Sequence, residues 1–369
     1  MDALFELAGG DLVDPKIVIP ASVPLELSGE AVRGRICTFQ DEAGKEWALR
    51  PDLTLPVALD EIEGRRSGQV SGETTRQYRA PVFRLPAVAG EPVEFEQVGF
   101  EVFAGASSPE RDASVLASVI TASENAGATS GHICFGDLGL FPAFVDAFEL
   151  PDEASAGLKR AFRQEGGVRA YLAGQSADTS SLTDRLKGMS RDEAAAFVDD
   201  IFKLTGIRPV GERSSDEIVE RMFERANGGV ADIPTAVKTI LDRVLNVDGL
   251  VDAALAEIAT IAAEADLSAV NAKIERLTQR HDLISRKCDA AWLQGARFAT
   301  RFGRRFTYYD GFVFEIAQSA GASHAAIPFA AGGRYDALLS NLSGGDVDET
   351  AIGGVVIPHR LNADYGGVA

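Results

Sequence analysis

The sequence has few cysteines and far fewer basic than acidic residues. Its three cysteines, Cys37, Cys134 and Cys288, lie far apart, with no Cys-x-x-Cys pair, so neither a disulfide framework nor a zinc site is indicated. Of the 369 residues, 36 are basic and 55 are acidic, which gives a formal net charge of -19. Most of the surface would therefore repel a phosphate backbone. We expect no metal site and no general binding of nucleic acid.

Long hydrophobic runs and histidine clusters are also absent. No basic segment precedes an apolar run at the start of the chain, and no stretch has the roughly 18 uncharged apolar residues that a membrane span needs. The four histidines have no neighbours arranged as metal ligands or as a catalytic triad. These absences predict a cytoplasmic protein that does not bind membranes and is not a serine hydrolase.

Strand signals lie at both ends of the sequence, and helix signals lie between them. Residues 15–147 contain short apolar runs separated by Pro and Gly, and similar runs return at 301–316 and 352–357. The order strand-rich, helical, strand-rich predicts one α+β domain built from residues 1–147 and 285–369.

The helical part is predicted as a separate domain inserted at residues 148–284. It is rich in Ala, Glu, Lys, Arg and Leu with helical periodicity. Two helix starts carry the Ser-x-x-Glu capping box, Ser190 with Glu193 and Ser214 with Glu217.

Asp52 and Thr54 form the first candidate site. Pro51 and Pro56 bracket them, which predicts a short extended piece with both side chains on one side. A carboxylate beside a hydroxyl would suit a ligand ammonium group. The alternative is a turn in which both side chains bond nearby backbone.

The segment 95–103 forms the second candidate site. As a strand it places Gln97, Gly99 and Glu101 on one face. A glycine between two hydrogen-bonding side chains leaves room for a ligand to lie against the backbone. The alternative is a sheet with one solvated face.

Two further segments contain tyrosines. Alternation along 303–315 places Tyr308 and Tyr309 on opposite faces of a strand, where they suit a flat ligand or serve as core residues. In the string GGRYD, which includes Tyr335, glycines before Arg334 could admit an anionic ligand to the backbone. The string lacks the length and ending of a phosphate-binding P-loop.

In their order these segments resemble the catalytic domain of histidyl-tRNA synthetase, a class II enzyme. The resemblance covers residues 15–147 and 285–361. It implies an α+β, class II aminoacyl-tRNA synthetase-like core with a mainly antiparallel sheet flanked by helices, plus the inserted helical domain. The segments that carry it are RPDLT at 50–54, Phe83-Arg84 with FEQVGFEVF at 95–103 (motif 2), 304–315 (the histidine-specific string), GGRYD at 332–336 and 351–361 (motif 3).

The resemblance also implies a site for free histidine. Asp52 and Thr54 would meet its ammonium group, with Gln97 nearby, and Glu101 and Tyr309 would address its imidazole. The other residues implied at this site are Arg84 and Arg304 beside the carboxylate, with Tyr308 and Tyr335 in the same pocket. Two carboxylates and two guanidiniums suit a zwitterion, because each ligand charge finds a partner.

The sequence departs from the synthetases where they hold ATP. The loop that follows Arg84 in 84–92 has no basic residue, and Ile357 replaces a glycine of motif 3. In the histidine-specific string, RRFTYY makes Arg304 an approximate match. Only eight residues follow Leu361, so we expect no anticodon-binding domain.

Together these features resemble the regulatory subunit of ATP phosphoribosyltransferase. That resemblance implies no catalytic residue and no cofactor on this chain, with histidine as a regulatory ligand. It implies a short-form catalytic subunit as partner, which uses ATP, phosphoribosyl pyrophosphate and magnesium in the first step of histidine biosynthesis. The chain would form a homodimer within a hetero-octamer, and would be required for activity and for feedback inhibition by histidine. The alternatives are a residual histidine-activating synthetase and a histidine-binding module with another partner.

Overall fold

The chain divides into two compact units. The larger contains residues 1–147 and 243–369, and the smaller contains residues 148–242. The first boundary coincides with the predicted one, whereas the second lies at 242 and not at 284. The computed structural model describes residues 9–28, 30–87, 91–104, 107–164, 166–173, 189–205, 233–303, 307–318 and 327–361.

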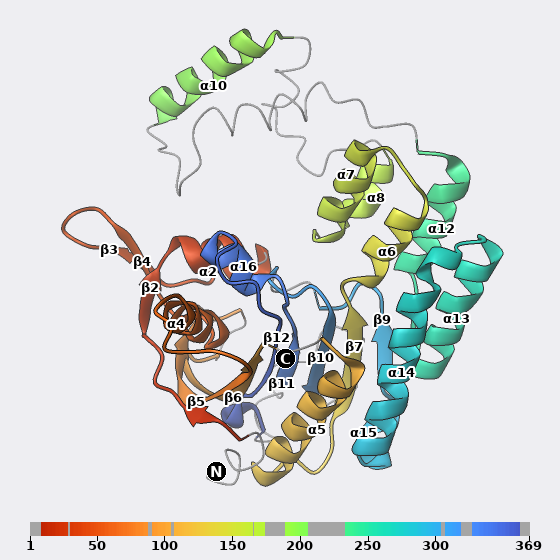
Figure 1. Cartoon of the computed structure of the whole chain (residues 1–369). Helices are drawn as coiled ribbons and strands as arrows, with labels where there is room; N and C mark the ends of the chain where they lie inside the picture. Colours follow the sequence, from red (N-terminus) through yellow and green to blue (C-terminus); the bar gives the residue numbers. More distant parts are fainter. Residues whose placement is uncertain are drawn as a thin grey trace. The chain divides into compact units, whose positions relative to one another are not determined.

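A nine-stranded sheet forms the centre of the larger unit, in the order β1-β5-β6-β12-β11-β10-β7-β9-β8 (Figure 1). The pairs β1–β5 and β7–β9 are parallel, and the others are antiparallel, which confirms the expected mainly antiparallel sheet. The strands are β1 (Asp11–Leu12), β5 (Thr74–Phe83), β6 (Glu94–Phe103), β7 (His132–Asp137), β8 (Asp248–Leu250), β9 (Arg297–Ala299), β10 (Phe312–Ala317), β11 (Pro328–Arg334) and β12 (Ala351–Val356). A separate three-stranded sheet has the order β2-β4-β3, from Val18–Pro20, Glu46–Leu49 and Thr38–Gln40.

Helices cover both faces of the large sheet (Figure 1). Two adjacent glycines of β12 identify the faces, because successive residues of a strand point to opposite sides. A Cβ added at Gly353 would meet the carboxylate of Glu101, which bonds Thr54 of α4 (Thr54–Arg66). A Cβ added at Gly354 would meet Val119 of α5 (Pro109–Asn125). Both faces of the central strands are therefore buried, and a polar side chain there must find a partner within the protein.

Helix α14 (Asn271–Lys287) packs beside α5. Buried ion pairs connect these two helices to the large sheet. Asp112 accepts hydrogen bonds from Arg280 Nε at 2.7 Å and from Arg334 Nη2 at 2.5 Å. Arg280 also donates to Asp137 of β7 at 2.9 Å. This network and the pairing of β8 with β9 connect residues 243–284 to the sheet, although their composition assigned them to the inserted domain. Arg334 is engaged in internal ion pairs. Its guanidinium is therefore not available to bind an external anion.

The other helices belong partly to the larger and partly to the smaller unit. In the smaller unit the capping box at Ser190 is confirmed, because its backbone N–H donates to Glu193 Oε2 at 2.8 Å. The second predicted box, Ser214 with Glu217, lies outside the described residues. The remaining helices are α2 (Ser22–Leu27), α3 (Glu30–Arg33), α6 (Leu140–Ala147), α7 (Asp152–Phe162), α8 (Gly167–Leu172), α10 (Arg191–Thr205), α12 (Thr235–Leu245), α13 (Val251–Glu264), α15 (Ala290–Leu293), α16 (Leu338–Ser343) and the 3-10 helices η1 (Ser268–Val270) and η2 (Pro358–Leu361). Within the described ranges, no helix has both the length and the apolar character needed to cross a membrane.

Candidate functional site

The carboxylate of Glu101 lies at the centre of a buried cluster of hydroxyl groups. Glu101 is in the interior of β6 and only 1% exposed. Its Oε1 accepts hydrogen bonds from the hydroxyls of Thr54 at 2.6 Å and Tyr78 at 2.9 Å, and its Oε2 accepts one from Tyr335. One acidic side chain of β6 thus contacts side chains from β5, from α4 and from the residue that follows β11. The predicted polar face of the 95–103 strand is confirmed, but it is buried, and the alternative of a solvated face is excluded.

Glycines make room for this cluster. Gly353 of β12 is the partner of Glu101 in the strand register, and a Cβ there would lie 1.5 Å from Oε2. Gly99 was expected to leave room for a ligand against the backbone. Instead, a Cβ at Gly99 would lie 2.4 Å from the carbonyl oxygen of Gly354 and 2.9 Å from the ring of Tyr78. The space at Gly99 is therefore taken by the neighbouring strand and by the tyrosine that bonds Glu101.

Asp52 lies at the start of α4 and not in an extended piece. Since Thr54 is the first residue of that helix, the predicted alternation of Asp52 and Thr54 along a strand is wrong. Asp52 Oδ1 accepts the backbone N–H of Leu55 at 3.0 Å, as at the first turn of many helices. Its other oxygen, Oδ2, is buried and has no hydrogen-bond partner among the described residues. Asp52 therefore has one oxygen that fixes the turn and one that is available to a ligand donor.

Burial makes both carboxylates unusually weak acids. It raises the pKa of Asp52 to about 6, against the hydrogen bond from Leu55 and the charge of Arg84, which lower it. Burial raises the pKa of Glu101 to about 7, and the charge of Asp52 adds to this effect, while the three hydroxyl donors oppose it. A positively charged ligand group beside these carboxylates would lower both pKa values, because it stabilises their ionised forms.

Tyr308 and Tyr309 lie together with Tyr335 beside this cluster. Their ring centroids are 4.8 Å apart, and those of Tyr308 and Tyr335 are 5.7 Å apart. Both precede β10, which begins at Phe312, so their prediction on opposite faces of a strand is wrong. Asp310 holds this segment in place, since its carboxylate accepts the backbone N–H groups of Asp336 and Ala337 at 3.1 and 2.8 Å. No local pattern predicts this role of Asp310, because it depends on contact between segments that are distant in the chain.

Arg84 and Gln97 complete the part of the predicted site that the structure describes. Gln97 is buried and lies on the same face of β6 as Glu101, four residues away. Arg84 is 8% exposed, its Nε has no hydrogen-bond partner among the described residues, and its guanidinium lies 4.7 Å from the ring centroid of Phe95. Burial and the charge of Arg360 lower the pKa of Arg84 to about 10, so it remains a cation at neutral pH. Arg304 lies outside the described residues.

Sequence reasoning missed several residues that shape the cluster. Tyr78 and Gly353 act on Glu101 from the two strands beside it, and only the strand order brings them there. The described residues contain no group of three His, Cys, Asp or Glu side chains that could hold a metal ion.

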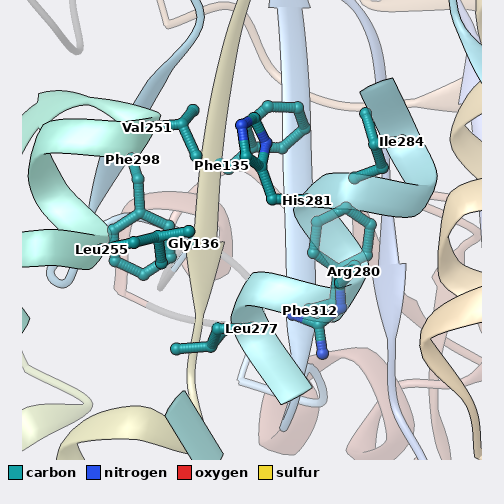
Figure 2. A pocket seen from close by; sticks show the side chains of 10 residues that line it. All are labelled: Phe135, Gly136, Val251, Leu255, Leu277, Arg280, His281, Ile284, Phe298 and Phe312. Carbon is teal, nitrogen blue, oxygen red and sulfur yellow. The ribbon is translucent and has the colours of Figure 1, made fainter. Parts of the chain in front are cut away.

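A hollow occurs on the opposite face of the sheet, under α13 and α14 (Figure 2). Its lining is mostly apolar. Arg280 contributes a charge there, but its guanidinium donates hydrogen bonds to Asp112 and Asp137. The guanidinium carbon lies 4.7 Å from the ring centroid of Phe312. Such a lining offers little to a zwitterion. The residues are Phe135, Gly136, Val251, Leu255, Leu277, Arg280, His281, Ile284, Phe298 and Phe312.

Solved structures with the same fold include two that match almost the whole chain. One is described as an ATP phosphoribosyltransferase regulatory subunit/histidyl-tRNA synthetase from Bacillus halodurans; it has a TM-score of 0.62 and 18% identity, with 98% of this chain and 76% of that chain covered. Histidyl-tRNA synthetase from Nostoc sp. gives a TM-score of 0.58 and 16% identity, with 98% and 68% covered. At these identities the likeness shows a shared fold, and it confirms the expected class II synthetase-like core.

Sequence comparison is more specific. Residues 1–206 match the model of the histidyl-tRNA synthetase family. An ATP phosphoribosyltransferase regulatory subunit from Mesorhizobium japonicum is 31% identical over 364 residues, which cover 95% of this chain and 92% of the relative. Another from Chelativorans sp. is 29% identical over 348 residues, covering 90% and 87%. On this near full-length similarity, the chain belongs to the family of ATP phosphoribosyltransferase regulatory subunits, which is related to the histidyl-tRNA synthetases.

Proposed function

We propose that the chain is the regulatory subunit of an ATP phosphoribosyltransferase and that the Glu101 cluster is its sensor for free histidine. The names of its near full-length relatives support the first part. The buried pair of Asp52 and Glu101, with one oxygen of Asp52 lacking a partner among the described residues, carries the second. A buried carboxylate oxygen without a donor is costly, and a ligand ammonium group removes that cost.

The charges of the cluster fit a zwitterion with a flat side chain. We assign the ammonium group to Asp52 and Thr54, with Gln97 nearby, and the ligand carboxylate to Arg84. The imidazole is assigned to Glu101 and to the tyrosines Tyr308, Tyr309 and Tyr335. A cation and an anion held by opposite charges in a partly dry site bind more strongly than either alone. Arg304, the other residue expected at the carboxylate, lies outside the described residues.

The chain itself is proposed to be non-catalytic and to act through a short-form catalytic subunit, as a homodimer within a hetero-octamer. Its loop after Arg84 offers no basic side chain through Pro92, so it lacks the charges that would grip a nucleotide triphosphate. Histidine would then regulate the partner by binding two states of the assembly with different affinity.

Mixing the chain with a short-form catalytic subunit tests this function. The partner condenses ATP with phosphoribosyl pyrophosphate, and formation of phosphoribosyl-ATP is measured with and without histidine. We expect the chain to stimulate the reaction and histidine to reverse that stimulation. A catalytic subunit that is indifferent to the chain would contradict the proposal. Histidine-dependent exchange of pyrophosphate into ATP by the chain alone would instead support the synthetase alternative.

The affinity for histidine is expected to rise between pH 6.5 and pH 8. Ionised Asp52 and Glu101 are the binding forms, and their pKa values of about 6 and about 7 leave part of each protonated at pH 6.5. Between pH 6.5 and 8 the loss of these protons should tighten binding about fivefold. Calorimetry in buffers of different ionisation enthalpy measures both the affinity and the protons released. Equal affinity at the two pH values would contradict this assignment.

A further inference from the structure

The hollow under α13 and α14 is lined mainly by buried apolar side chains, and three of these are phenylalanines of the sheet (Figure 2). Phe135 and Phe298 are register partners on β7 and β9, and the rings of Phe135 and Phe312 stack with their centroids 5.9 Å apart. The space that no atom fills is about 290 Å³, counted to its open mouth, which is near the lower end for small-molecule sites. The hollow therefore suits one flat ring system, which can stack on these rings or meet their edges.

The charged side chain in this lining is already compensated inside the protein. Arg280 is 5% exposed, and its guanidinium donates to Asp112 at 2.7 Å and to Asp137 at 2.9 Å. Both carboxylates are fully buried. A charged ligand would lose its hydration in the hollow without gaining a partner of opposite charge. The ligand that fits is therefore neutral.

His281 places a hydrogen-bond acceptor in the apolar lining. Its Nε2 lies 3.0 Å from Oδ1 of Asp252, and the ring supplies the proton of this bond because an ionised carboxylate can only accept. In the neutral ring Nδ1 is then an acceptor. The side chain of Asp252 is 91% exposed, which holds the Nε2 edge of the ring toward solvent, whereas Nδ1 is buried and has no hydrogen-bond partner among the described residues.

The position of the imidazole brings this acceptor to the hollow. Figure 2 shows the ring of His281 extending from α14 toward Val251 of α13, and both residues belong to the lining. A buried acceptor without a donor is unfavourable, and a ligand N–H or O–H group that reaches it removes that cost.

We propose that the hollow binds a small neutral aromatic molecule with one N–H or O–H donor, of the size of an indole or a phenol, and that Nδ1 of His281 accepts its hydrogen bond. The phenylalanine rings supply the contact area, and the single acceptor fixes the orientation of the ligand. This site lies on the other face of the sheet from the Glu101 cluster and shares no residue with it. The inference therefore does not rest on histidine binding.

Indole and benzofuran are the probes that test this site. They have the same shape, but benzofuran has an oxygen in place of the N–H group and cannot donate to His281. Titration of the full chain at pH 8, where histidine side chains are ordinarily neutral, is followed by ligand-observed NMR. Indole should bind at least fivefold more tightly than benzofuran, because only indole satisfies the buried acceptor. The absence of saturable indole binding within its solubility would overturn the proposal.

His281→Phe locates the bound probe. The new ring has a similar size but no acceptor, and the loss of the pair leaves only the exposed, hydrated carboxylate of Asp252. Indole and benzofuran should then bind with equal affinity. The control is His132→Phe, since His132 is an exposed residue at the start of β7, and this variant should keep the preference for indole. A preference that survives in His281→Phe would refute the assignment.

Nitrogen NMR of the unmodified protein gives the same answer if His281→Phe does not fold. The resonance of Nδ1 of His281 should shift when indole is added, because the nitrogen gains a donor, and should stay in place with benzofuran. An equal response to the two probes would contradict the proposal. The assay uses neither histidine nor a catalytic subunit, so its failure is distinct from a failure of the proposed function.

Discussion

Gly353→Ala is expected to destabilise the protein by roughly 3–5 kcal/mol and to abolish histidine binding, because the new methyl group and the Glu101 carboxylate cannot occupy the same space. The added Cβ would lie 1.5 Å from Glu101 Oε2 and 2.6 Å from the carbonyl oxygen of Phe100. Neither Glu101 nor the backbone of β6 can retreat, since both sit in the middle of the sheet. Urea denaturation and histidine calorimetry measure the two effects.

Gly249→Ala is the matched control for this change. Gly249 is also a strand residue, in β8, but a Cβ there meets nothing within 4 Å. We expect a change in the free energy of unfolding within about 0.5 kcal/mol and unaltered histidine affinity. A Gly353→Ala protein as stable as this control would refute the close approach of β12 to Glu101.

Glu101→Gln is expected to weaken histidine binding by at least a hundredfold while the fold persists. Glutamine has the same size, and its carbonyl oxygen still accepts hydroxyl hydrogen bonds, but it has no charge for the ligand; the loss of such a charged contact costs about 3 kcal/mol. Glu101→Ala is less informative, because it would leave the hydroxyls of Thr54, Tyr78 and Tyr335 buried without their acceptor. Calorimetry at pH 8, where Glu101 is ionised, gives the clearest comparison.

The control for Glu101→Gln is Glu96→Gln. Glu96 lies on the same strand, but its side chain is 37% exposed and pairs with Arg79. It should bind histidine as the unmodified protein does. If Glu101→Gln also retained full affinity, histidine would bind elsewhere, and the family assignment would stand without this sensor. If it lost affinity together with its thermal stability, the circular dichroism spectrum would reveal the damage to the fold.

The strand that carries Gln97 and Glu101 could be predicted from the sequence. Alternation of side chains is a local property, and it placed both residues on one face correctly. What the sequence could not provide was the burial of that face, because burial depends on α4 and on Tyr335, which are distant in the chain. The prediction that Gly99 leaves room for a ligand is wrong for the same reason, because the space is filled by Gly354 and Tyr78 from the neighbouring strands.

Two local predictions failed because tertiary contacts decided them. Pro51 and Pro56 suggested an extended piece, but a proline is accepted in the first turn of a helix, and α4 begins at Thr54. Alternation suggested a strand through Tyr308 and Tyr309, but Asp310 binds the backbone after Tyr335 and keeps the segment out of the sheet.

Composition also could not tell where the inserted domain ends. Helices α13 and α14 continue the helical pattern of the residues before them, yet both belong to the larger unit. The membership of α14 depends on contacts with distant segments, among them the ion pairs of Arg280 with Asp112 of α5 and Asp137 of β7. A periodic pattern shows that a helix has a buried face, and says nothing about which partner buries it.

The pairing of β6 with β12 has a consequence for how the protein is made. Glu101 and Gly353 are register partners although about 250 residues separate them, and such distant pairings form late and slowly in folding. The acceptor for the ligand is thus synthesised early on the ribosome, and the strand that completes its surroundings is synthesised near the end. If the Glu101 cluster is the histidine site, as proposed, a nascent chain cannot respond to histidine until β12 has emerged and docked between β6 and β11.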